Sequence, residues 1–419
     1  MQPSSSASRS LAIHVLHHAL TTSTAPEFIR LTQFGGPAPN DADSRFIRSM
    51  VLSALRHLGQ IDALLASYIE KPLPASKAWV QCALRIGICQ MRFHDVPAHA
   101  AVNSTVEAVK QSKYKALCGM ANAVLKRAAY DTSPLAAPAS NLPDWLRQRL
   151  IAQYGDACVN AVAAVAEQQP ATDIFGATPD NKFPAQALNA YTMRCENIEA
   201  LHGYLHTQTT CFVQDIAASY PVHMLGNISG KTVIEIGAAP GGKTMQMLMA
   251  GAQVTALDRS EKRMRRLQEN LAARGLNTPC IVIDALKYTP DSTPDIVVLD
   301  APCTATGTWR KHPEVVHLLR ENDIHDLARV QAQLMDKAWS WLASGGVLAY
   351  SVCSLQKEEG EDQLAAFLSR HPDTRIHAPD TTHLHALCVQ RDGSVRTHPA
   401  MMAGHGGMDG FFAVLLKKM

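Results

Sequence analysis

The second half of the chain alternates short β-rich runs with helical segments, and this rhythm restricts the possible folds more than any other feature. The runs expected to form strands are 232–237, 253–258, 280–284, 295–300 and 346–351. Helical patterns lie between or after them, at 243–251, 260–274, 314–342 and 358–370. Because parallel strands need long crossover connections, this alternation predicts a doubly wound, mostly parallel sheet. A last apolar run, 409–418, predicts one more strand that joins the sheet in antiparallel orientation.

The first part of the chain shows only helical periodicity. Apolar side chains recur at helical spacing between residues 8 and 130 and prolines separate the segments, so we expect five to seven helices there. A run rich in Pro, Ala and Ser follows and has the composition of a linker. The sequence therefore predicts four parts: a helical domain at 1–131, a linker at 132–143, a mixed subdomain at 144–225 and an α/β domain at 226–419.

The net charge of +2 conceals a difference between these parts. Residues 1–135 contain 14 Lys and Arg against 8 Asp and Glu, a balance of +6, so the remainder carries −4. A basic front part favours a polyanionic partner, although an ordinary solvated lysine face would give the same balance. Hydrophobic residues make up 47% of the chain and charged residues 18%, which excludes a disordered protein.

The 10 cysteines are scattered, with no Cys-x-x-Cys pair and no Cys/His group at zinc spacing. We therefore expect neither disulfides nor a metal ion, and reduced thiols of this kind are typical of the cytoplasm. The first residues make a poor signal peptide, and no uninterrupted apolar stretch reaches the ~18 residues that a membrane span needs. The expectation is a cytoplasmic, monomeric protein.

The loop GAAPGGKT, residues 237–244, follows the first expected strand and opens a helix. It matches the P-loop pattern G-x-x-x-x-G-K-[ST], and IVVLD at 296–300 could be a Walker B strand, so a nucleotide hydrolase is one interpretation. Against it, Asp258 ends the next strand, 21 residues after Gly237. A carboxylate at that place typically accepts hydrogen bonds from the ribose hydroxyls of a nucleoside ligand.

Acidic and thiol side chains end several of the expected strands. Asp258, Asp284 and Asp300 close the second, third and fourth strands, and Cys303 and Cys353 follow the fourth and fifth. Taken singly, such residues are more often turn, cap or core residues. Because the carboxyl ends of parallel strands share one edge of a sheet, however, all five are expected to converge. Three carboxylates repel a triphosphate but suit a ligand with a sulfonium and an adenine amino group, and two cysteines have no purpose in nucleotide hydrolysis.

Together these motifs resemble the Sun-type (RsmB-like) RNA cytosine-carbon-5 methyltransferases, and the resemblance covers nearly the whole chain. The motifs that carry it are AAPGGKT (238–244), ALDRSEKRMRRLQENLAARG (256–275), LDAPCTATGT (299–308), YSVCSLQKEEGED (350–362), DGFF (409–412), PAHAAVNSTVEAVK (97–110) and GMANAVLKR (119–127). The resemblance implies an all-α NusB-like domain followed by an α/β Rossmann-like methyltransferase domain with a mostly parallel seven-stranded sheet. It also implies S-adenosylmethionine as cofactor and RNA, in particular 16S ribosomal RNA of the small subunit, as substrate.

By this resemblance the glycine loop wraps the methionine and ribose parts of the cofactor, with Gly237, Ala238, Ala239, Pro240, Gly241, Gly242 and Lys243. Asp258 would bind the ribose hydroxyls and Asp284 the adenine amino edge, while Asp300 would lie beside the methyl group and the target base. The chain departs from the family at Gly237, where a cysteine usually sits, and at Glu235, which replaces an aspartate.

The chemistry of cytosine methylation explains a pair of cysteines. Carbon 5 is a poor nucleophile until a thiolate adds to carbon 6 and makes the ring enamine-like; afterwards carbon 5 loses its proton and the thiolate is eliminated. A carboxylic acid such as Asp300 promotes the addition by protonating ring nitrogen 3. The family pattern makes Cys353 the nucleophile and Cys303 the residue that assists release, with Lys243 positioning Asp300 or the base. A DNA methyltransferase would use the Cys303 position as nucleophile, so the presence of both cysteines favours RNA.

Candidate RNA contacts lie in two parts of the chain. The segment TWRKHPE, 308–314, places Trp309, Arg310 and Lys311 after Cys303, a mixture that suits base stacking and phosphate contact, with an ordinary solvated loop as the alternative. Resemblance to NusB-like modules suggests four further contacts: Arg85, Lys110, Lys113 and Lys115.

Two other regions bear on the substrate. The helix after Asp258 carries Arg263, Arg265 and Arg266, which we expect on a solvated face. Residues 171–190 lack a clear match to the RNA-binding strand that such enzymes usually carry there. A non-catalytic RNA-binding or assembly factor with the same fold therefore stands as a further alternative, opposed by the two cysteines, the three aspartates and the intact glycine loop.

Overall fold

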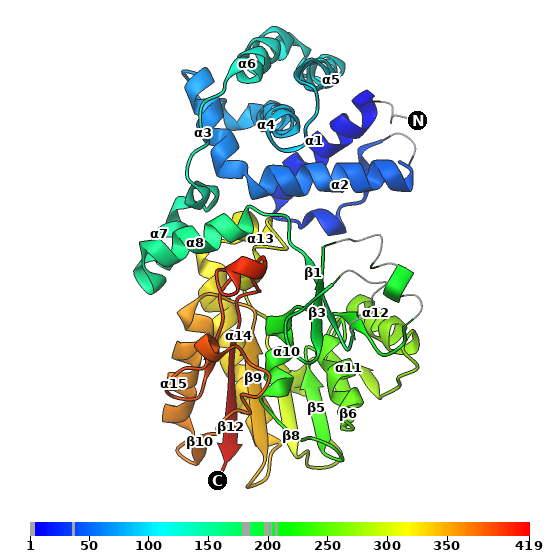
Figure 1. The fold of residues 1–419 in the computed structure, drawn as a ribbon, viewed down its shortest axis with the longest axis vertical. Coiled ribbons are helices and arrows are strands. Elements are labelled where there is room, and N and C mark those ends of the chain that lie inside the picture. The colour runs from blue at the N-terminus through cyan, green and yellow to red at the C-terminus, as the bar shows by residue number, and fades with distance from the viewer. Residues whose placement is uncertain (1–4, 36–37, 178–184, 197–200, 202, 206–207) are drawn as a thin grey trace. The chain divides into compact units, whose positions relative to one another are not determined.

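The computed structural model describes residues 5–35, 38–177, 185–196, 201, 203–205 and 208–419 (Figure 1). The chain packs into two compact units, Met1–Glu167 with Lys311–Leu319 and Gln168–Arg310 with Arg320–Met419. The first unit is helical, whereas the second contains both β-sheets (Figure 1).

Six α-helices precede residue 131 in the described part of the chain, within the expected range. They are α1 (Ser5–Thr22), α2 (Asp41–Arg56), α3 (Leu58–Tyr68), α4 (Ala78–Phe93), α5 (Ala98–Gln111) and α6 (Cys118–Tyr130). Local signals start two of them: the Asn40 side chain accepts a hydrogen bond from the Asp43 backbone N–H before α2, and Pro97 precedes α5. The expected helical character of this region is confirmed.

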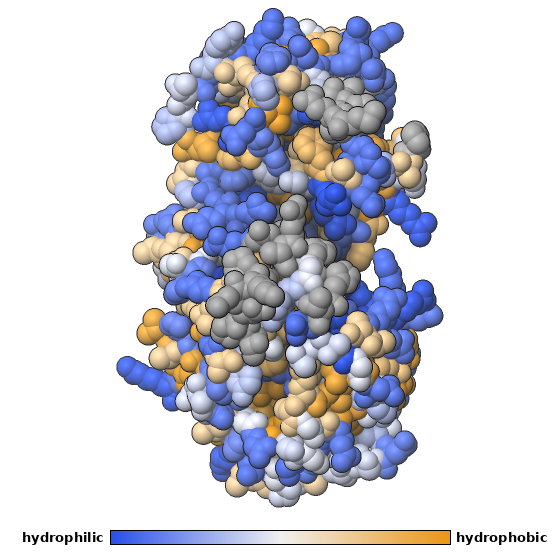
Figure 2. All heavy atoms as spheres, turned by 45° about the vertical axis from the view of Figure 1, so that its right-hand side comes forward, coloured by the Kyte–Doolittle hydropathy of each residue, from blue (hydrophilic) through white to orange (hydrophobic). Residues whose placement is uncertain are grey.

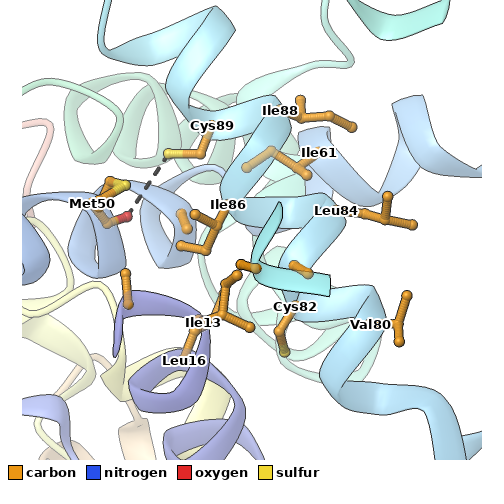
Figure 3. Packing of buried hydrophobic residues seen from close by; sticks show 14 of the residues in the cluster. Ile13, Leu16, Met50, Ile61, Val80, Cys82, Leu84, Ile86, Ile88 and Cys89 are labelled. Atoms are coloured by element: carbon orange, nitrogen blue, oxygen red, sulfur yellow. Dashed lines mark hydrogen bonds between the residues drawn. The ribbon is translucent and has the colours of Figure 1, made fainter. Parts of the chain in front are cut away.

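The core of the first unit is built from the apolar faces of these helices. Ile13 and Leu16 of α1 pack with Met50 of α2 and with the buried side of α4 (Figure 3). Cys89 lies in this core, where its thiol donates to the Met50 carbonyl at 3.8 Å, and burial raises its pKa to about 12. This cysteine is therefore a small buried hydrophobe, as expected for most of the ten.

The first unit extends through the proline-rich run and two further helices, α7 (Asp144–Tyr154) and α8 (Asp156–Ala166). The run is held to α3: the Gln60 backbone N–H donates to the buried Asn141 side chain at 3.0 Å, and the Gln60 side chain donates to the Ala136 carbonyl at 2.8 Å. Gly59 allows this approach, since a Cβ there would lie 1.7 Å from the Ser140 carbonyl oxygen. The predicted linker is thus packed against the helices. The four functional ranges drawn from the sequence stay a prediction.

The main sheet of the second unit has the order β10-β12-β9-β8-β5-β6-β7, seven strands within the described residues, with β11 paired to β12 in addition. The strands are β5 (Thr232–Ile236), β6 (Gln253–Asp258), β7 (Cys280–Val282), β8 (Ile296–Asp300), β9 (Val347–Val352), β10 (Thr374–Ile376), β11 (Val395–Arg396) and β12 (Phe412–Lys418). Pairing is parallel from β7 through β9, whereas β12 runs antiparallel to β9. The mostly parallel sheet with an antiparallel last strand is therefore confirmed.

Helices cover both faces of this sheet, which makes it doubly wound (Figure 1). The helices α10 (Ile216–His223), α11 (Gly242–Met249) and α12 (Glu261–Ala272) pack on one face. The helices α14 (Glu321–Ser340) and α15 (Glu361–Arg370) pack on the other. Successive residues of β12 serve the two cores in turn: Leu415 belongs to the first and Leu416 to the second.

The single helix expected over 314–342 is wrong, because the chain breaks after a short helix, α13 (Val315–Leu318). Leu319 and Arg320 are extended, and the Arg320 backbone N–H donates to the Asp323 carboxylate at 2.9 Å, which caps the start of α14. The break also separates the two units, since α13 packs within the first and α14 within the second.

A smaller antiparallel sheet, of order β2-β3-β1-β4, occupies the region that the sequence left undecided. Its strands are β1 (Thr172–Phe175), β2 (Gln186–Ala187), β3 (Thr192–Cys195) and β4 (Phe212–Val213). The segment considered for an RNA-binding strand, 171–190, includes β1 and β2, but residues 178–184 of it lie outside the described residues.

The surface carries mixed polarity on the face drawn in Figure 2, where apolar residues are interspersed among hydrophilic ones. Among the helices described, none is long and apolar enough to cross a membrane.

Candidate active site

A cavity of about 630 Å³ opens at the carboxyl ends of the central strands β5, β6 and β8. Its lining includes all five strand-end residues singled out from the sequence, together with the first glycine of the loop: Gly237, Asp258, Asp284, Asp300, Cys303 and Cys353. Apolar side chains such as Ile283, Leu286 and Leu334 complete the wall. The parallel sheet therefore brings three carboxylates and two thiols, far apart in sequence, around one space.

The glycine loop is bound tightly to the strand edge. Gly237 has φ +79°, and its backbone N–H donates to the Leu257 carbonyl of β6 at 2.9 Å. A Cβ at this position would lie 2.3 Å from the Asp300 carbonyl oxygen, so only glycine fits this backbone without displacement. Gly237 is thus the loop residue at the cavity wall. Ala238 and Ala239 behind it are buried.

Lys243, at the start of α11, turns toward the end of β8. Its Nζ lies 2.8 Å from Asp300 Oδ2, and the lysine side chain is only 7% exposed. Burial lowers the pKa of Lys243, but the charge of Asp300 and the hydrogen bond to it outweigh burial, so the pKa is raised overall. A Walker lysine would reach toward phosphates, whereas this one is held by a carboxylate. That pairing disfavours the nucleotide-hydrolase interpretation.

Glu235, two residues before the loop, is buried on β5 and accepts a hydrogen bond of 2.5 Å from the Thr244 hydroxyl. Burial raises the pKa of Glu235 to about 8, against the lowering effects of Thr244 and of the Lys243 charge. This shift favours the protonated form of the Glu235 carboxyl near neutral pH.

Asp258 is held by the loops on either side. Its Oδ1 accepts from the Ser260 backbone N–H at 2.9 Å and its Oδ2 from the Ala239 N–H at 3.3 Å. Arg263 lies 3.4 Å from the same carboxylate, donates to the Ala239 carbonyl and lines the cavity. Arg263 is 56% exposed, as expected for a solvated face, and its contact with the cavity is an addition that the sequence analysis missed. Its place five residues after a strand-end aspartate was the available signal.

The two cysteines meet across the cavity wall. Cys303 Sγ lies 3.5 Å from Cys353 Sγ, and both residues are partly exposed. The hydrogen bond with Cys353, and then burial, raise the pKa of Cys303 well above its ordinary value. Cys303 therefore remains a protonated thiol near neutral pH and can donate a hydrogen bond to the sulfur of Cys353.

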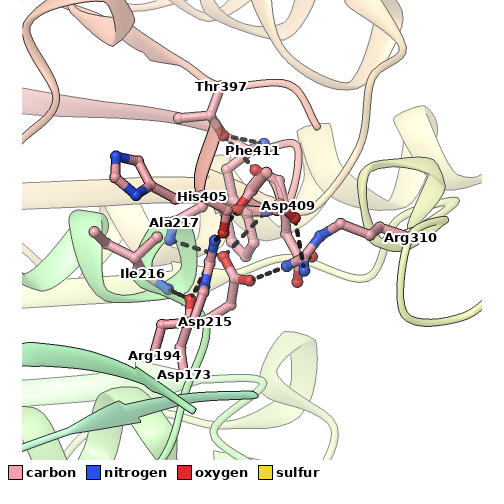
Figure 4. Close-up of polar contacts among 12 residues, drawn as sticks. Asp173, Arg194, Asp215, Ile216, Ala217, Arg310, Thr397, His405, Asp409 and Phe411 are labelled. Atoms are coloured by element: carbon pink, nitrogen blue, oxygen red, sulfur yellow. Dashed lines mark hydrogen bonds and ion pairs between the residues drawn. The ribbon is translucent and has the colours of Figure 1, made fainter. Parts of the chain in front are cut away.

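The expected RNA contact by Trp309 and Arg310 is wrong, because both side chains are buried. Arg310 is 0% exposed, and its guanidinium lies 2.7 Å from Asp215 and 3.2 Å from Asp409 (Figure 4). These two carboxylates come from segments distant in sequence, which local composition cannot reveal. The ion pair with Arg310 also gives a structural role to Asp409, the aspartate of the DGFF motif.

The basic residues proposed for the helical unit divide into two kinds. Arg85 is committed to Asp62, to which it donates two hydrogen bonds of 2.7 and 2.6 Å, so its expected contact with RNA is not favoured. Lys110, Lys113 and Lys115 are exposed and stay candidates. Within the described residues, no group of three or more His, Cys, Asp or Glu is placed to hold a metal ion.

Two family models match the chain, one in its helical part and one in its α/β part. The NusB family model covers residues 6–130, and the model described as 16S rRNA methyltransferase RsmB/F covers residues 222–417.

Relatives match over most of their length. The ribosomal RNA small subunit methyltransferase B of Citrobacter koseri is 30% identical over 407 residues, which cover 90% of this chain and 92% of that protein. The corresponding protein of Shewanella oneidensis is 29% identical and covers 90% and 91%.

Solved structures agree on the fold. The crystal structure of PH0851 covers 98% of this chain and 99% of its own, with a TM-score of 0.73 at 21% identity. A methyltransferase homologue protein from Pyrococcus horikoshii covers 66% of this chain and 95% of its own, with a TM-score of 0.53 at 23% identity. The structure combines a helical NusB-like unit with a doubly wound sheet whose cavity lies at the carboxyl edge. Its relatives are 30% identical over nine-tenths of the chain, which is enough to assign the family. The chain belongs to the RsmB/F family of 16S rRNA methyltransferases.

Proposed function

We propose that the protein transfers a methyl group from S-adenosylmethionine to carbon 5 of a cytosine in 16S ribosomal RNA. The reaction would proceed through a bond between Cys353 and carbon 6 of that base. The observation that carries this proposal is the meeting of two thiols, 3.5 Å apart, at a cavity that Asp300 also lines. One thiol suffices for addition to the ring, and a second finds use only when the adduct has to be released.

The residues of the cavity fit S-adenosylmethionine. Its volume of about 630 Å³ lies within the range of small-molecule sites. Asp258 would accept hydrogen bonds from the ribose hydroxyls, and Asp284 from the adenine amino group, between apolar walls that include Ile283 and Leu286. Because Gly237 has no Cβ, the backbone of the glycine loop itself forms this part of the cavity wall. When bound, this cofactor supplies a sulfonium methyl group that a carbon nucleophile can attack.

The first step belongs to Cys353 and Asp300. The Cys353 thiolate forms a carbon–sulfur bond at carbon 6, and ring nitrogen 3 takes up a proton or a strong hydrogen bond from the Asp300 carboxyl. Lys243, with its Nζ 2.8 Å from Asp300, orients that carboxyl and is the adjacent proton reserve. The electrons of the former double bond then make carbon 5 nucleophilic.

Release belongs to both cysteines. Once carbon 5 is methylated, its proton leaves to a base or to water, the carbon–sulfur bond breaks, Cys353 departs as a thiolate, and ring nitrogen 3 returns its proton to Asp300. The protonated Cys303, 3.5 Å away, stabilises that thiolate by donating a hydrogen bond. Cys303 is therefore proposed to speed elimination rather than addition.

Two substitutions separate these steps. Cys353→Ala should abolish methyl transfer and form no adduct, whereas Cys303→Ala should accumulate a covalent protein–RNA complex that survives denaturing electrophoresis. Cys280→Ala, a partly exposed cysteine on β7, is the matched control and should behave as the wild type. Methylation by the Cys353→Ala variant would contradict the assignment of the nucleophile.

We further propose that the helical unit, which includes the basic range 1–131, binds RNA, and that 226–419 carries out methyl transfer. The support is the charge of +6 over residues 1–135 and the exposed Lys110, Lys113 and Lys115. Replacing the three lysines by alanine should weaken RNA binding at low salt. It should also reduce the slope of log Kd against log salt concentration by the amount that about three phosphate contacts contribute. Unchanged salt dependence would place the RNA elsewhere.

A further inference from the structure

A buried carboxylate outside the proposed chemistry lies between the two cysteine segments. Glu359 ends a short 3-10 helix, Lys357–Glu359, shortly after Cys353, and its side chain is 0% exposed. A buried carboxylate is costly unless hydrogen bonds satisfy it, so its partners indicate what it does.

The partners of Glu359 are the residues that directly follow each cysteine. On the Cys303 side, Oε1 accepts from the Thr304 backbone N–H at 2.9 Å, and Oε2 accepts from the Thr304 hydroxyl at 2.5 Å. On the Cys353 side, Oε2 accepts from the Ser354 hydroxyl. One carboxylate thus joins the two segments at the positions next to the thiols.

A second side chain completes the arrangement from α14. Gln331 Nε2 donates to Glu359 Oε1 at 2.9 Å and to the Pro302 carbonyl at 2.9 Å. Pro302, before Cys303, is therefore bonded to Gln331, and Thr304, after it, is bonded to Glu359, and these two side chains are bonded to each other. Each carboxylate oxygen accepts two hydrogen bonds, which is the full capacity of a carboxylate.

We infer that Glu359 is a positioning residue that holds the Cys303 and Cys353 thiols in contact. It fixes the positions of the two segments through Thr304, Ser354 and Gln331, and its charge also contributes to raising the pKa of Cys303. The consequence for release of the RNA adduct rests on the proposed function, but the contact between the thiols is a property of the protein alone.

The geometry distinguishes two substitutions of Glu359. Glutamine keeps one oxygen for the two N–H donors, and its amide can face the hydroxyls of Thr304 and Ser354, which rotate to accept. Alanine leaves four buried donors without this acceptor, so the two segments lose their common anchor. Burial raises the pKa of Glu359, opposed by the hydrogen bonds from Ser354, Thr304 and Gln331, and a neutral amide is therefore a fair replacement.

The test measures the thiol pair directly with phenylarsine oxide. This trivalent arsenical forms two As–S bonds to a pair of adjacent thiols, and its oxygen leaves as water with the two thiol protons, so no oxidant is needed. Binding is measured by titration of the purified full chain. The signal that disappears in Cys303→Ser defines the contribution of this pair.

We expect Glu359→Ala to bind the arsenical at least about tenfold more weakly than the wild type, and Glu359→Gln to stay within about threefold of it. These factors correspond to the net free energy that a hydrogen bond contributes. Asp362→Ala removes an exposed carboxylate three residues on and should change nothing. A folded Glu359→Ala variant with wild-type affinity would overturn the inference.

If the alanine variant does not fold, the double variant Thr304→Val/Ser354→Ala decides. It removes both hydroxyl donors and keeps the carboxylate, and we expect about a fivefold loss of affinity, with wild-type affinity overturning the inference. Methyl transfer is measured in parallel. Arsenical binding that follows this pattern in a protein without cytosine methylation would contradict the proposed function while leaving the positioning role intact.

Discussion

The buried Glu235 gives the second unit a pH-dependent stability that one substitution should remove. Its carboxyl is 1% exposed, and burial raises its pKa from 4.5 to about 8 in the folded chain. The stabilisation that comes from holding this proton is fully present below pH 4.5 and is lost as the pH rises through about 8.

The size of the effect follows from these two values. Between them each pH unit lowers the free energy of unfolding by about 1.4 kcal/mol, because the folded chain must take up a proton that the unfolded chain has released. From pH 5 to pH 7 this amounts to about 3 kcal/mol. Glu235→Gln carries no titrating proton, so its unfolding free energy relative to the wild type should rise by the same amount over that interval. Any constant effect of packing the amide cancels in this comparison.

The assay is urea unfolding at pH 5, 6, 7 and 8, followed by tryptophan fluorescence, since the buried Trp309, Trp339 and Trp341 report on the second unit. Glu261→Gln, whose parent side chain is 79% exposed on α12, is the control and should parallel the wild type at every pH. The reasoning is refuted if the Glu235→Gln and wild-type stabilities change in parallel between pH 5 and pH 7.

Two further substitutions test the loop and the buried ion cluster. Gly237→Ala should cost about 1–2 kcal/mol for the left-handed backbone and more for the 2.3 Å approach to a β8 carbonyl, and it should weaken S-adenosylmethionine binding in calorimetry. Gly230→Ala has a similar φ of +75° with open space around it and should show only the backbone cost; equal effects of the two would rule out the clash. Arg310→Met should lower the free energy of unfolding by about 3–5 kcal/mol, because it leaves two buried carboxylates uncompensated. Arg265→Met, at a pair whose arginine is 66% exposed, should change it by less than about 1 kcal/mol in the same urea titration, and a fully stable Arg310→Met with weakened RNA binding would restore the discarded RNA contact.

Most of the main sheet could be predicted from the sequence because β5, β6, β8, β9 and β12 are five to seven residues long and largely apolar, and helices separate most of them. β10 and β11, of three and two residues, are too short to show a period and are formed by pairing with β12. The break between α13 and α14 was equally hidden, because residues on both sides form helices. The helices on the two sides of the break belong to different units.

The same division applies to the candidate site. Strand-end residues such as Asp258 and Cys353 could be placed because the topology of a parallel sheet fixes where its strands end. Arg310 was misplaced because the composition of its segment, 308–314, suits a solvated loop. In the structure Arg310 is buried and forms ion pairs with Asp215 and Asp409, which are distant in sequence. Glu359 gave no signal of its own, since its meaning depends on hydrogen bonds to Thr304, 55 positions earlier in the chain.

The central claim is the identity of the methylated atom, and analysis of the nucleoside product tests it most directly. The protein is incubated with unmodified 16S ribosomal RNA, free or in small-subunit particles, and isotopically labelled S-adenosylmethionine, and the RNA is digested to nucleosides for mass spectrometry. We predict that the label appears in 5-methylcytidine with wild-type protein and is absent with Cys353→Ala. Label in any other nucleoside, or 5-methylcytidine formed by Cys353→Ala, would contradict the account.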